Sequence, residues 1–524
     1  MSEPSRAGSP ARPHGPASAL SHAAPVWLDF GCAALFGALH SVAFVVTPAW
    51  LLQLVAVAML AGRAAHAAPA RAALLGMAFA SAWLGSSIWW LFISMHRYGG
   101  LPAWMAALAV ALLCVGLALF LALALGAFAR WRSARGARDA LLFAAVWTLA
   151  EIARGMLFTG FPWAASGYAH VDSPLSWLAP WIGVYGIGAA AAGLAAAPVL
   201  ARPTRRARSG WLLGALGVLG ALGLAPVAQF TEAGSTLNVA LLQGNVPQNE
   251  KFSQAHLPEA MAWTQQSLLA ARADLVLGPE TVIPLLPQQL DPAYWQPLLD
   301  HFRQPGRAAL IGLPLGNERI GYTNSAAGIT ARTAALPEGF YRYDKHHLVP
   351  FGEFVPPLFK WFVRMMDIPL GDFNRGVPAA PSFAVNGERI GPNICYEDLF
   401  GEELAARFRD PDAAPTILAN LSNIGWYGPT IAVDQHLHIS RIRSLEFQRP
   451  MLRATNTGAT VVIDHEGRVT HALAPHTQGV LEAPVQGRSG TTPFARWAGA
   501  AGLWPMIGTA LLICAGFAWR RAVR

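Results

Sequence analysis

The sequence predicts a polytopic α-helical membrane domain, then an α/β domain, then one closing helix. Three observations lead to this prediction. Hydrophobic residues make up 54% of the 524 residues and charged residues only 13%, against roughly 25% charged residues in an average soluble protein. The apolar residues gather in runs of about 20, the length that a helix needs to cross a bilayer. One long segment, from about 235 to 487, instead alternates strand-like and helix-like stretches, which is typical of an α/β domain.

Eight apolar runs predict the membrane spans. About seven lie within residues 26–230, before the α/β segment, and the last lies within 498–520. They occur at about 27–46, 49–67, 72–94, 102–129, 139–158, 174–200, 210–229 and 499–519. The preceding tail, residues 1–25, is rich in Pro, Ser and Ala, so we expect it to be disordered.

Basic residues predict the orientation of these spans. Arginine clusters follow the second, fourth and sixth runs and the last one, whereas the alternate connections Thr47–Trp50 and His96–Gly100 hold almost none. The positive-inside rule then places both termini in the cytoplasm and the α/β segment on the outer face of the membrane. These clusters also account for the net charge of +8. No stripe of basic and aromatic residues indicates nucleic-acid binding.

The α/β segment reads as a series of buried strands and amphipathic helices. Strands are predicted at Leu237–Gln243, Asp274–Leu277, Ala308–Leu313, Arg389–Ile394, Thr416–Ser422 and Met451–Asp464, the last closed by a turn at His465–Gly467. Helices are predicted at His256–Arg272 and Val433–Arg449. Glu280 and Cys395 both follow strand ends, where α/β folds commonly place reactive side chains.

Cys395 is the one cysteine outside the apolar runs, because Cys32, Cys114 and Cys514 each lie within one. If the α/β segment faces an oxidising compartment, a thiol without a disulfide partner is either accidental or a nucleophile. A cysteine nucleophile needs a nearby base or positive charge. Glu280 could take the thiol proton, and Lys345 could stabilise an oxyanion together with a backbone N–H after Cys395.

Each of these three residues also has an ordinary explanation. Glu280 could be a solvated turn residue, Lys345 could form a surface ion pair with Asp344, and Cys395 could be a small buried apolar residue. Their joint occurrence favours the catalytic interpretation.

Three patches, Leu277–Thr281, Tyr343–Glu353 and Asn393–Asp398, carry a family resemblance. The order and local context of Glu280, Lys345 and Cys395 resemble the nitrilase superfamily. Together with the membrane spans, the chain resembles the apolipoprotein N-acyltransferase family. The resemblance covers nearly the whole chain and includes the segments Thr159–Trp163, Gln243–Pro247 and Arg449–Gly458.

This resemblance implies an α/β nitrilase-like αββα sandwich outside the cytoplasm, with Glu280 as base, Lys345 as oxyanion stabiliser and Cys395 as nucleophile. It assigns supporting roles in the active site to Glu353, Tyr396 and Glu397. The implied location is the inner membrane of a bacterium, with the sandwich in the periplasm.

The implied reaction is a ping-pong acyl transfer. Cys395 takes an acyl chain from a phospholipid as a thioester and passes it to the α-amine of the diacylglyceryl-cysteine of an apolipoprotein. The membrane spans favour a phospholipid donor, because a small polar substrate would not require them. We expect no cofactor, no metal and no nucleic acid, and a monomer surrounded by membrane lipids.

Five further residues are candidates for substrate binding. Trp426 and Tyr427, with Asn423, could line an acyl route, although ordinary packing is the alternative. Glu151 and Arg154, three residues apart within a predicted span, either organise the mouth of a lipid-facing site or stabilise the bundle.

Two other features leave their roles open. The residues 356–373 are predicted as a membrane-dipping arm or as an amphipathic core helix. Four histidines lack the spacing of a metal site, so we expect structural or surface roles for His346, His347, His436 and His438.

Two other functions are compatible with parts of the pattern. A membrane-tethered amidase or lipid hydrolase would use water as acceptor, and strict dependence on a lipidated amine would exclude it. A transporter or scaffold with an inactive nitrilase-like domain is disfavoured by the presence of Glu280, Lys345 and Cys395. Neither a Walker A pattern nor a Gly-x-Ser-x-Gly elbow is present, so nucleotide hydrolysis and serine-hydrolase chemistry lack support.

Overall fold

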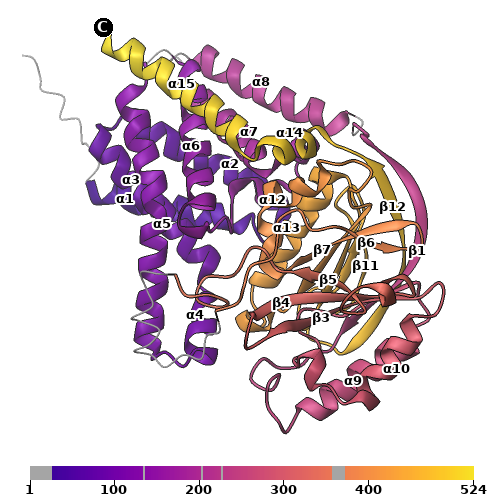
Figure 1. The fold of residues 1–524 in the computed structure, drawn as a ribbon. Coiled ribbons are helices and arrows are strands. Elements are labelled where there is room, and N and C mark those ends of the chain that lie inside the picture. Colours follow the sequence, from indigo (N-terminus) through magenta and orange to yellow (C-terminus); the bar gives the residue numbers. More distant parts are fainter. Residues whose placement is uncertain (1–25, 134–135, 202–204, 226–227, 357–371, 524) are drawn as a thin grey trace, which may run out of the picture.

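A computed structural model describes the chain except residues 1–25, 134–135, 202–204, 226–227, 357–371 and 524. The predicted disordered tail and most of the predicted arm at 356–373 therefore lie outside the described residues. Figure 1 shows the N-terminal helices gathered on one side of two β-sheets, with the C-terminal helix α15 running back along the helices.

The N-terminal half is a bundle of apolar helices. Its principal members are α1 (Val26–Val42), α2 (Trp50–Ala65), α3 (Pro69–Ile88), α5 (Ala103–Trp131), α6 (Arg138–Met156), α7 (Ala179–Leu200) and α8 (Arg205–Leu224). Among the described residues, five helices are long and apolar enough to cross a membrane, and up to seven if each of two bent pairs counts as one span. The chain is therefore a multi-pass membrane protein.

Two of the eight predicted apolar runs are bent where the sequence suggested continuous spans. Helix α3 is followed, at a bend of 60°, by the segment Leu91–Tyr98, which contains α4 (Leu91–Ile93) and a π-helical turn (Ser94–Tyr98). At the C-terminus, α14 (Pro493–Ala501) and α15 (Trp504–Ala522) meet at 85°. Gly502 allows this second bend because its φ of +56° is readily adopted only without a side chain.

The α/β domain contains two six-stranded sheets. The first has the order β12-β1-β2-β3-β4-β5, and the second has the order β11-β10-β9-β8-β7-β6. The first sheet is built from β1 (Thr231–Gln243), β2 (Leu275–Leu277), β3 (Ala308–Asn317), β4 (Gly321–Ile329), β5 (Tyr341–Asp344) and β12 (Gly479–Gly490). The second is built from β6 (Phe383–Val385), β7 (Glu388–Ile394), β8 (Ile417–Ser422), β9 (Met451–Thr455), β10 (Val461–Ile463) and β11 (Val469–Ala472). In each sheet three central strands run parallel, and the outer pairs are antiparallel.

The two sheets pack face to face and are covered by helices on their outer faces. One apolar cluster fills the space between the sheets. A second lies between the first sheet and the helices α9 (Leu257–Ala270) and α10 (Pro292–Phe302). On the other side, α13 (Ala432–Phe447) belongs to the same apolar cluster as the membrane helices. This confirms the predicted αββα sandwich next to a helical membrane domain.

Most of the predicted strands and helices are confirmed within a few residues, but one prediction is wrong. The stretch Met451–Asp464 forms two strands, β9 and β10, and not one. The chain turns between them over residues 456–460, where the backbone N–H of Thr455 donates to the Thr460 hydroxyl at 3.1 Å. The hydroxyls of Thr455 and Thr460, 3.0 Å apart, close the turn.

Helix α13 joins the sandwich to the bundle. The side-chain oxygen of Gln435 accepts hydrogen bonds from the indole N–H groups of Trp163 at 2.8 Å and Trp90 at 3.1 Å. Its amide nitrogen donates to the Ser87 carbonyl at 3.0 Å. About three turns further along α13, Glu446 accepts from the backbone N–H of Val184 at 2.7 Å. The α/β domain is therefore fixed to the bundle by polar contacts within a shared apolar core.

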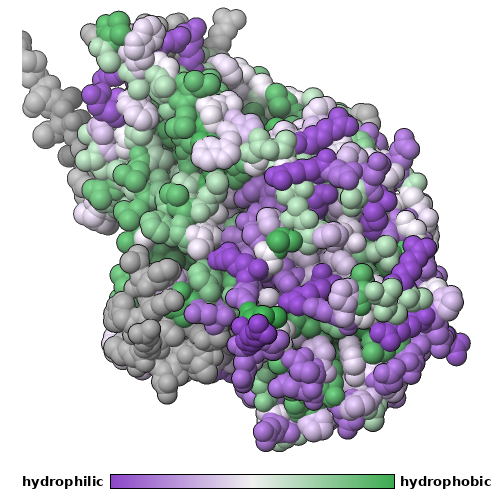
Figure 2. Space-filling view, in the orientation of Figure 1, coloured by the Kyte–Doolittle hydropathy of each residue, from purple (hydrophilic) through white to green (hydrophobic). Residues whose placement is uncertain are grey.

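The surface follows the same division. In Figure 2 hydrophobic residues cover much of the helical bundle, and hydrophilic residues dominate the α/β domain. Helix α5, for example, exposes several large apolar side chains, including Leu108, Leu112, Leu119 and Leu123. Apolar surface of this extent is what a helix in contact with lipid presents.

We predict that Gln435→Leu destabilises the protein by about 1–3 kcal/mol, because it leaves the buried indole N–H of Trp163 without its acceptor, whereas the Trp90 N–H keeps the Ser87 carbonyl at 2.9 Å. Denaturation in detergent, followed by fluorescence, measures this loss. The matched control is Gln296→Leu on the exposed face of α10, which should leave stability within about 0.5 kcal/mol. Equal stability of the two variants would show that Gln435 does not hold the domains together.

Candidate active site

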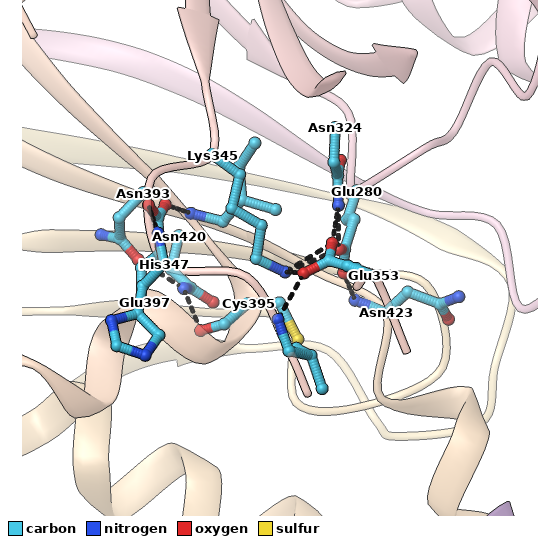
Figure 3. Close-up of polar contacts among 12 residues, drawn as sticks. Glu280, Asn324, Lys345, His347, Glu353, Asn393, Cys395, Glu397, Asn420 and Asn423 are labelled. Carbon is cyan, nitrogen blue, oxygen red and sulfur yellow. Dashed lines mark hydrogen bonds and ion pairs between the residues drawn. The ribbon is translucent and has the colours of Figure 1, made fainter. Parts of the chain in front are cut away.

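Glu280 lies three residues after the end of β2, a central strand of the first sheet. One of its carboxylate oxygens accepts from the side-chain amide of Asn324 at 2.7 Å, and the other accepts from the backbone N–H of Asn423 at 2.9 Å. The two partners come from different sheets, β4 and the end of β8. This places the Glu280 carboxylate at the junction of the two sheets, as Figure 3 shows.

Lys345 follows β5 and is only 1% exposed. Its Nζ donates to the carboxylate of Glu353 at 2.9 Å and lies 3.5 Å from Oε1 of Glu280. Burial alone would lower the pKa of this lysine, but the negative charges of Glu353 and then Glu280 outweigh that effect and raise the pKa. Lys345 is therefore a fixed positive charge at neutral pH.

Cys395 follows β7 at the facing edge of the second sheet. Its φ of +53° is unusual for a residue other than glycine. Figure 3 shows the sulfur of Cys395 beside the carboxylates of Glu280 and Glu353. Burial, followed by the negative charge of Glu280, raises the pKa of the thiol to about 12, although Lys345 acts in the opposite direction. The resting site consequently holds a neutral thiol, and attack on a substrate requires a base to take its proton.

Glu353, to which the family resemblance assigned a supporting role, completes the charge cluster. Besides Lys345, it accepts from the Asn324 side chain at 2.6 Å and from the backbone N–H of Val349 at 2.8 Å. The Asn324 amide thus joins both carboxylates. Asn324 was not identified from the sequence. The one feature that could have indicated it is a polar side chain within the buried run of β4.

Glu397 and Tyr396 are close to the site, but their side chains bind to protein groups. Glu397 accepts from the Tyr343 hydroxyl at 2.7 Å and from the backbone N–H groups of Ile394 at 2.6 Å and His346 at 2.7 Å. It therefore ties the segment after β5 to the end of β7. The Tyr396 hydroxyl donates to the Gly160 carbonyl, 3.0 Å away in the membrane domain.

The candidate binding residues that follow β8 lie in two environments. Asn423 is buried, orients Glu280 through its N–H, and donates its side-chain amide to Gln248 at 2.8 Å. Tyr427 packs against Trp90, with ring centroids 4.2 Å apart. Trp426 is 40% exposed and lies 5.8 Å from the ring of Tyr98. The aromatic pair thus meets the membrane domain at both ends of the bend, Tyr427 at Trp90 and Trp426 at Tyr98.

Glu151 and Arg154 are buried on α6 and hold the loop that faces Tyr396. Glu151 accepts from the backbone N–H of Ser166 at 2.6 Å and from its hydroxyl at 2.7 Å. Arg154 donates to the carbonyls of Phe161 at 2.9 Å and Trp163 at 2.6 Å. The pair therefore holds this loop of the bundle in place next to the α/β domain, and a role at the mouth of a lipid-facing site stays a prediction.

The histidines are mostly structural. His347 is buried, is 3.0 Å from Glu403 and from the Thr159 carbonyl, and stacks on Phe400. His436 and His438 are also buried, so the surface role allowed for these three residues is wrong. In the described part of the chain, no group of three or more His, Cys, Asp or Glu side chains could hold a metal ion.

Lys251 is a second buried lysine at the site, which the sequence did not reveal because it lies in a polar loop. Its Nζ donates to the backbone carbonyl of Glu280 at 3.0 Å. Burial lowers the pKa of Lys251 to about 8, against the opposing effect of Glu280. Lys251 therefore braces the loop that carries Glu280.

Comparisons with known proteins match both halves of the chain. Residues 36–197 match the family model of the apolipoprotein N-acyltransferase N-terminal domain, and residues 238–494 match that of carbon-nitrogen hydrolases. An apolipoprotein N-acyltransferase of Verminephrobacter eiseniae (strain EF01-2) is 55% identical over 483 residues, which cover 87% of this chain and 89% of that protein. One from Ralstonia nicotianae is 46% identical over 505 residues, 95% of this chain and 93% of that protein.

The solved structures are more distant. A carbon-nitrogen hydrolase from Helicobacter pylori G27 is 14% identical and has a TM-score of 0.34, covering 52% of this chain and 94% of that chain. A TM-score this low assigns neither a fold nor a function to this chain.

We predict opposite changes in the reactivity of Cys395 when the two charges beside it are removed. Glu280→Gln removes a negative charge that raises the thiol pKa, so the thiolate fraction and the rate of alkylation by iodoacetamide should increase. Lys345→Met removes a positive charge and should slow alkylation. In the wild-type protein the rate should rise about tenfold per pH unit from pH 6 to 9, without a plateau, because this range lies below the pKa.

The measurement is the second-order rate of alkylation at Cys395, located by peptide mass spectrometry. A plateau below pH 8, or the same direction of change in both variants, would contradict the electrostatic account.

Proposed function

The chain belongs to the apolipoprotein N-acyltransferase family, and we propose that it moves an acyl chain from a phospholipid to the lipoprotein amine through a thioester on Cys395. The observation that carries this proposal is the buried cluster of Glu280, Lys345 and Glu353 beside a thiol at a strand end. Such a cluster supplies a base and a fixed positive charge to one nucleophile.

The position of the site beside the membrane helices supports a lipid donor. The hydroxyl of Tyr396, the residue after the proposed nucleophile, donates to Gly160 in the loop after α6. His347, two residues after Lys345, contacts the carbonyl of Thr159 in the same loop. The neighbouring residue Phe158 is 88% exposed. An apolar side chain at this edge of the bundle is suited to contact with acyl chains.

In the first half-reaction Sγ of Cys395 attacks the ester carbonyl of the phospholipid while Glu280 takes the thiol proton. The carbonyl electrons move to oxygen, and Lys345 stabilises the resulting oxyanion with the backbone N–H of Tyr396. When this intermediate collapses, the ester C–O bond breaks. The lysophospholipid leaves as an alcohol with the proton held by Glu280, and the acyl chain remains on Cys395 as a thioester.

In the second half-reaction the α-amine of the diacylglyceryl-cysteine attacks the thioester. Glu280 takes a proton from the amine, the C–S bond breaks, and the sulfur of Cys395 is protonated again. The products are an amide on the lipoprotein and the free enzyme. The thioester supplies the energy for the amide bond, so this sequence needs no nucleotide or metal.

The remaining residues receive positioning roles in this proposal. Glu353 and Asn324 hold Lys345 and Glu280 in place, and Asn423 orients Glu280. Tyr427 and Trp426 form the wall of an acyl route next to the segment Leu91–Tyr98. These contacts argue for a precise geometry at the reacting atoms, on which acyl transfer depends.

The proposed organisation of the chain follows from the same argument. We place the catalytic domain at residues 235–487, after about seven spans in 26–230 and before a closing span in 498–520. The arginine clusters between the spans support a periplasmic catalytic domain and cytoplasmic termini. The proposed active form is a monomer, because all the groups assigned to the chemistry come from one chain.

We predict that Cys395→Ala and Glu280→Gln abolish transfer, and that Lys345→Met slows formation of the acyl-enzyme by about 100-fold or more, since it removes an oxyanion donor. Transfer is measured in detergent with a phospholipid carrying a labelled acyl chain and a diacylated lipopeptide. Cys114→Ala, on the buried face of α5, is the control and should retain activity. Activity in the Cys395 or Glu280 variant would exclude the mechanism, and acyl release without a lipopeptide at an equal rate would indicate a hydrolase.

A further inference from the structure

We infer that His436 is a positioning residue that, with Arg453, sets the peptide between Cys395 and Tyr396 so that its N–H faces the oxyanion. This inference rests on the proposed thioester chemistry and adds to it a positioning role for His436 and Arg453. The Cys395 carbonyl and the Tyr396 N–H belong to one planar peptide unit and point in opposite directions. A group that holds the carbonyl therefore also directs the N–H.

Two side chains hold this carbonyl. His436, on α13, lies with its Nε2 3.2 Å from the Cys395 oxygen. The side-chain amide of Asn420, on β8, donates to the same oxygen at 3.3 Å and to the Asn393 side chain at 2.6 Å. These contacts oppose relaxation of Cys395 from its left-handed conformation, with φ of +53°, which costs of order 1 kcal/mol or more for a residue with a side chain.

Arg453 determines how both donors are oriented. Its Nη2 lies 2.8 Å from Nδ1 of His436, and its Nη1 lies 3.4 Å from Oδ1 of Asn420. Arginine can only donate. The His436 Nδ1 and the Asn420 Oδ1 must therefore accept, so the proton of His436 is on Nε2 and the amide NH₂ of Asn420 faces Cys395.

The charge of Arg453 is itself offset within the core. Asp398 lies 3.6 Å from Nη1 of Arg453, and Ser440 donates to Asp398 while accepting from Arg453 at 2.6 Å. Burial and the adjacent Arg453 both lower the pKa of His436 well below its usual value. His436 thus stays neutral across the physiological range, and its Nε2–H remains a donor to Cys395.

The cooperative effect of these bonds strengthens the Tyr396 N–H as a donor. Hydrogen bonds to a carbonyl polarise the peptide unit to which it belongs. Because α13 also carries Gln435, the residue bonded to Trp90 and Trp163, the helix that docks on the membrane domain also orients the proposed oxyanion site.

Two substitutions separate the two hydrogen bonds of His436. In His436→Gln the side-chain Nε2 can occupy the place of the imidazole Nε2 and donate to Cys395. In His436→Asn the shorter side chain can reach Arg453 but not the Cys395 carbonyl. His438→Asn, on the same helix, is the matched control, because His438 is buried but bonds to the Phe44 carbonyl in the membrane domain.

The experiment uses full-length protein in detergent with phospholipid and no acceptor, and follows the acyl adduct by intact mass. We expect acylation to be about 10- to 100-fold slower in His436→Asn and within about fivefold of wild type in His436→Gln and His438→Asn. Alkylation of Cys395 by iodoacetamide, which forms no oxyanion, should change by less than about threefold in all of them. A purely structural role for His436 would change both rates together.

Wild-type acylation in His436→Asn, or equal slowing in His436→Gln, would overturn the inference. If His436→Asn does not fold, Asn420→Leu removes the other donor with little change in volume and should show the same selective loss; unchanged acylation there would also overturn it. Failure of the wild-type protein to form any adduct would instead count against the proposed thioester, so the two failures are distinguishable.

Discussion

The structure of the site depends on the burial of one ammonium group. Lys345 is removed from water, and its charge is offset by Glu353 at 2.9 Å and Glu280 at 3.5 Å. A buried charge with its partners removed costs several kcal/mol, so these three residues are stable only as a set. Asn324, which bonds both carboxylates, keeps the two negative charges at a fixed separation. The cluster requires the ends of β2 and β5 to meet beside Asn324 of β4, which ties the proposed chemistry to the first sheet.

The second sheet carries the proposed nucleophile, and the helix layer on its far side meets the helical bundle. Cys395 ends β7, and the layer beyond this sheet is α13, which packs into the core of the helical bundle. The same arrangement puts Tyr396 and His347 against the loop Thr159–Trp163, which Arg154 and Glu151 hold in place. A buried ion pair deep in the bundle is therefore linked, through one loop, to the residues beside the proposed nucleophile. The hydrogen bonds to this loop offset the cost of placing charged residues in a predicted membrane span.

The sequence was most informative where function constrains single residues. Glu280, Lys345 and Cys395 were predicted together, and so were the strand ends that carry Glu280 and Cys395. The short strand β5, which precedes Lys345, was not predicted. Asn324 was missed because β4, with its Asn, Ser, Ala and Gly, is rich in residues that do not favour strands. The bonding role of Glu397 was also missed, because its partners include backbone groups 50 residues away. The bends at Leu91 and Gly502 escaped prediction, since hydropathy measures the length of an apolar run and not its direction.

The most direct test is the intact mass of the purified protein after incubation with phospholipid in the absence of any acceptor. The account predicts an added acyl mass on Cys395 that hydroxylamine removes and that a diacylated lipopeptide discharges as an N-acylated product. The same mass should be absent from Cys395→Ala. An adduct on another residue, or transfer to the lipopeptide by Cys395→Ala, would contradict the central role of this thiol.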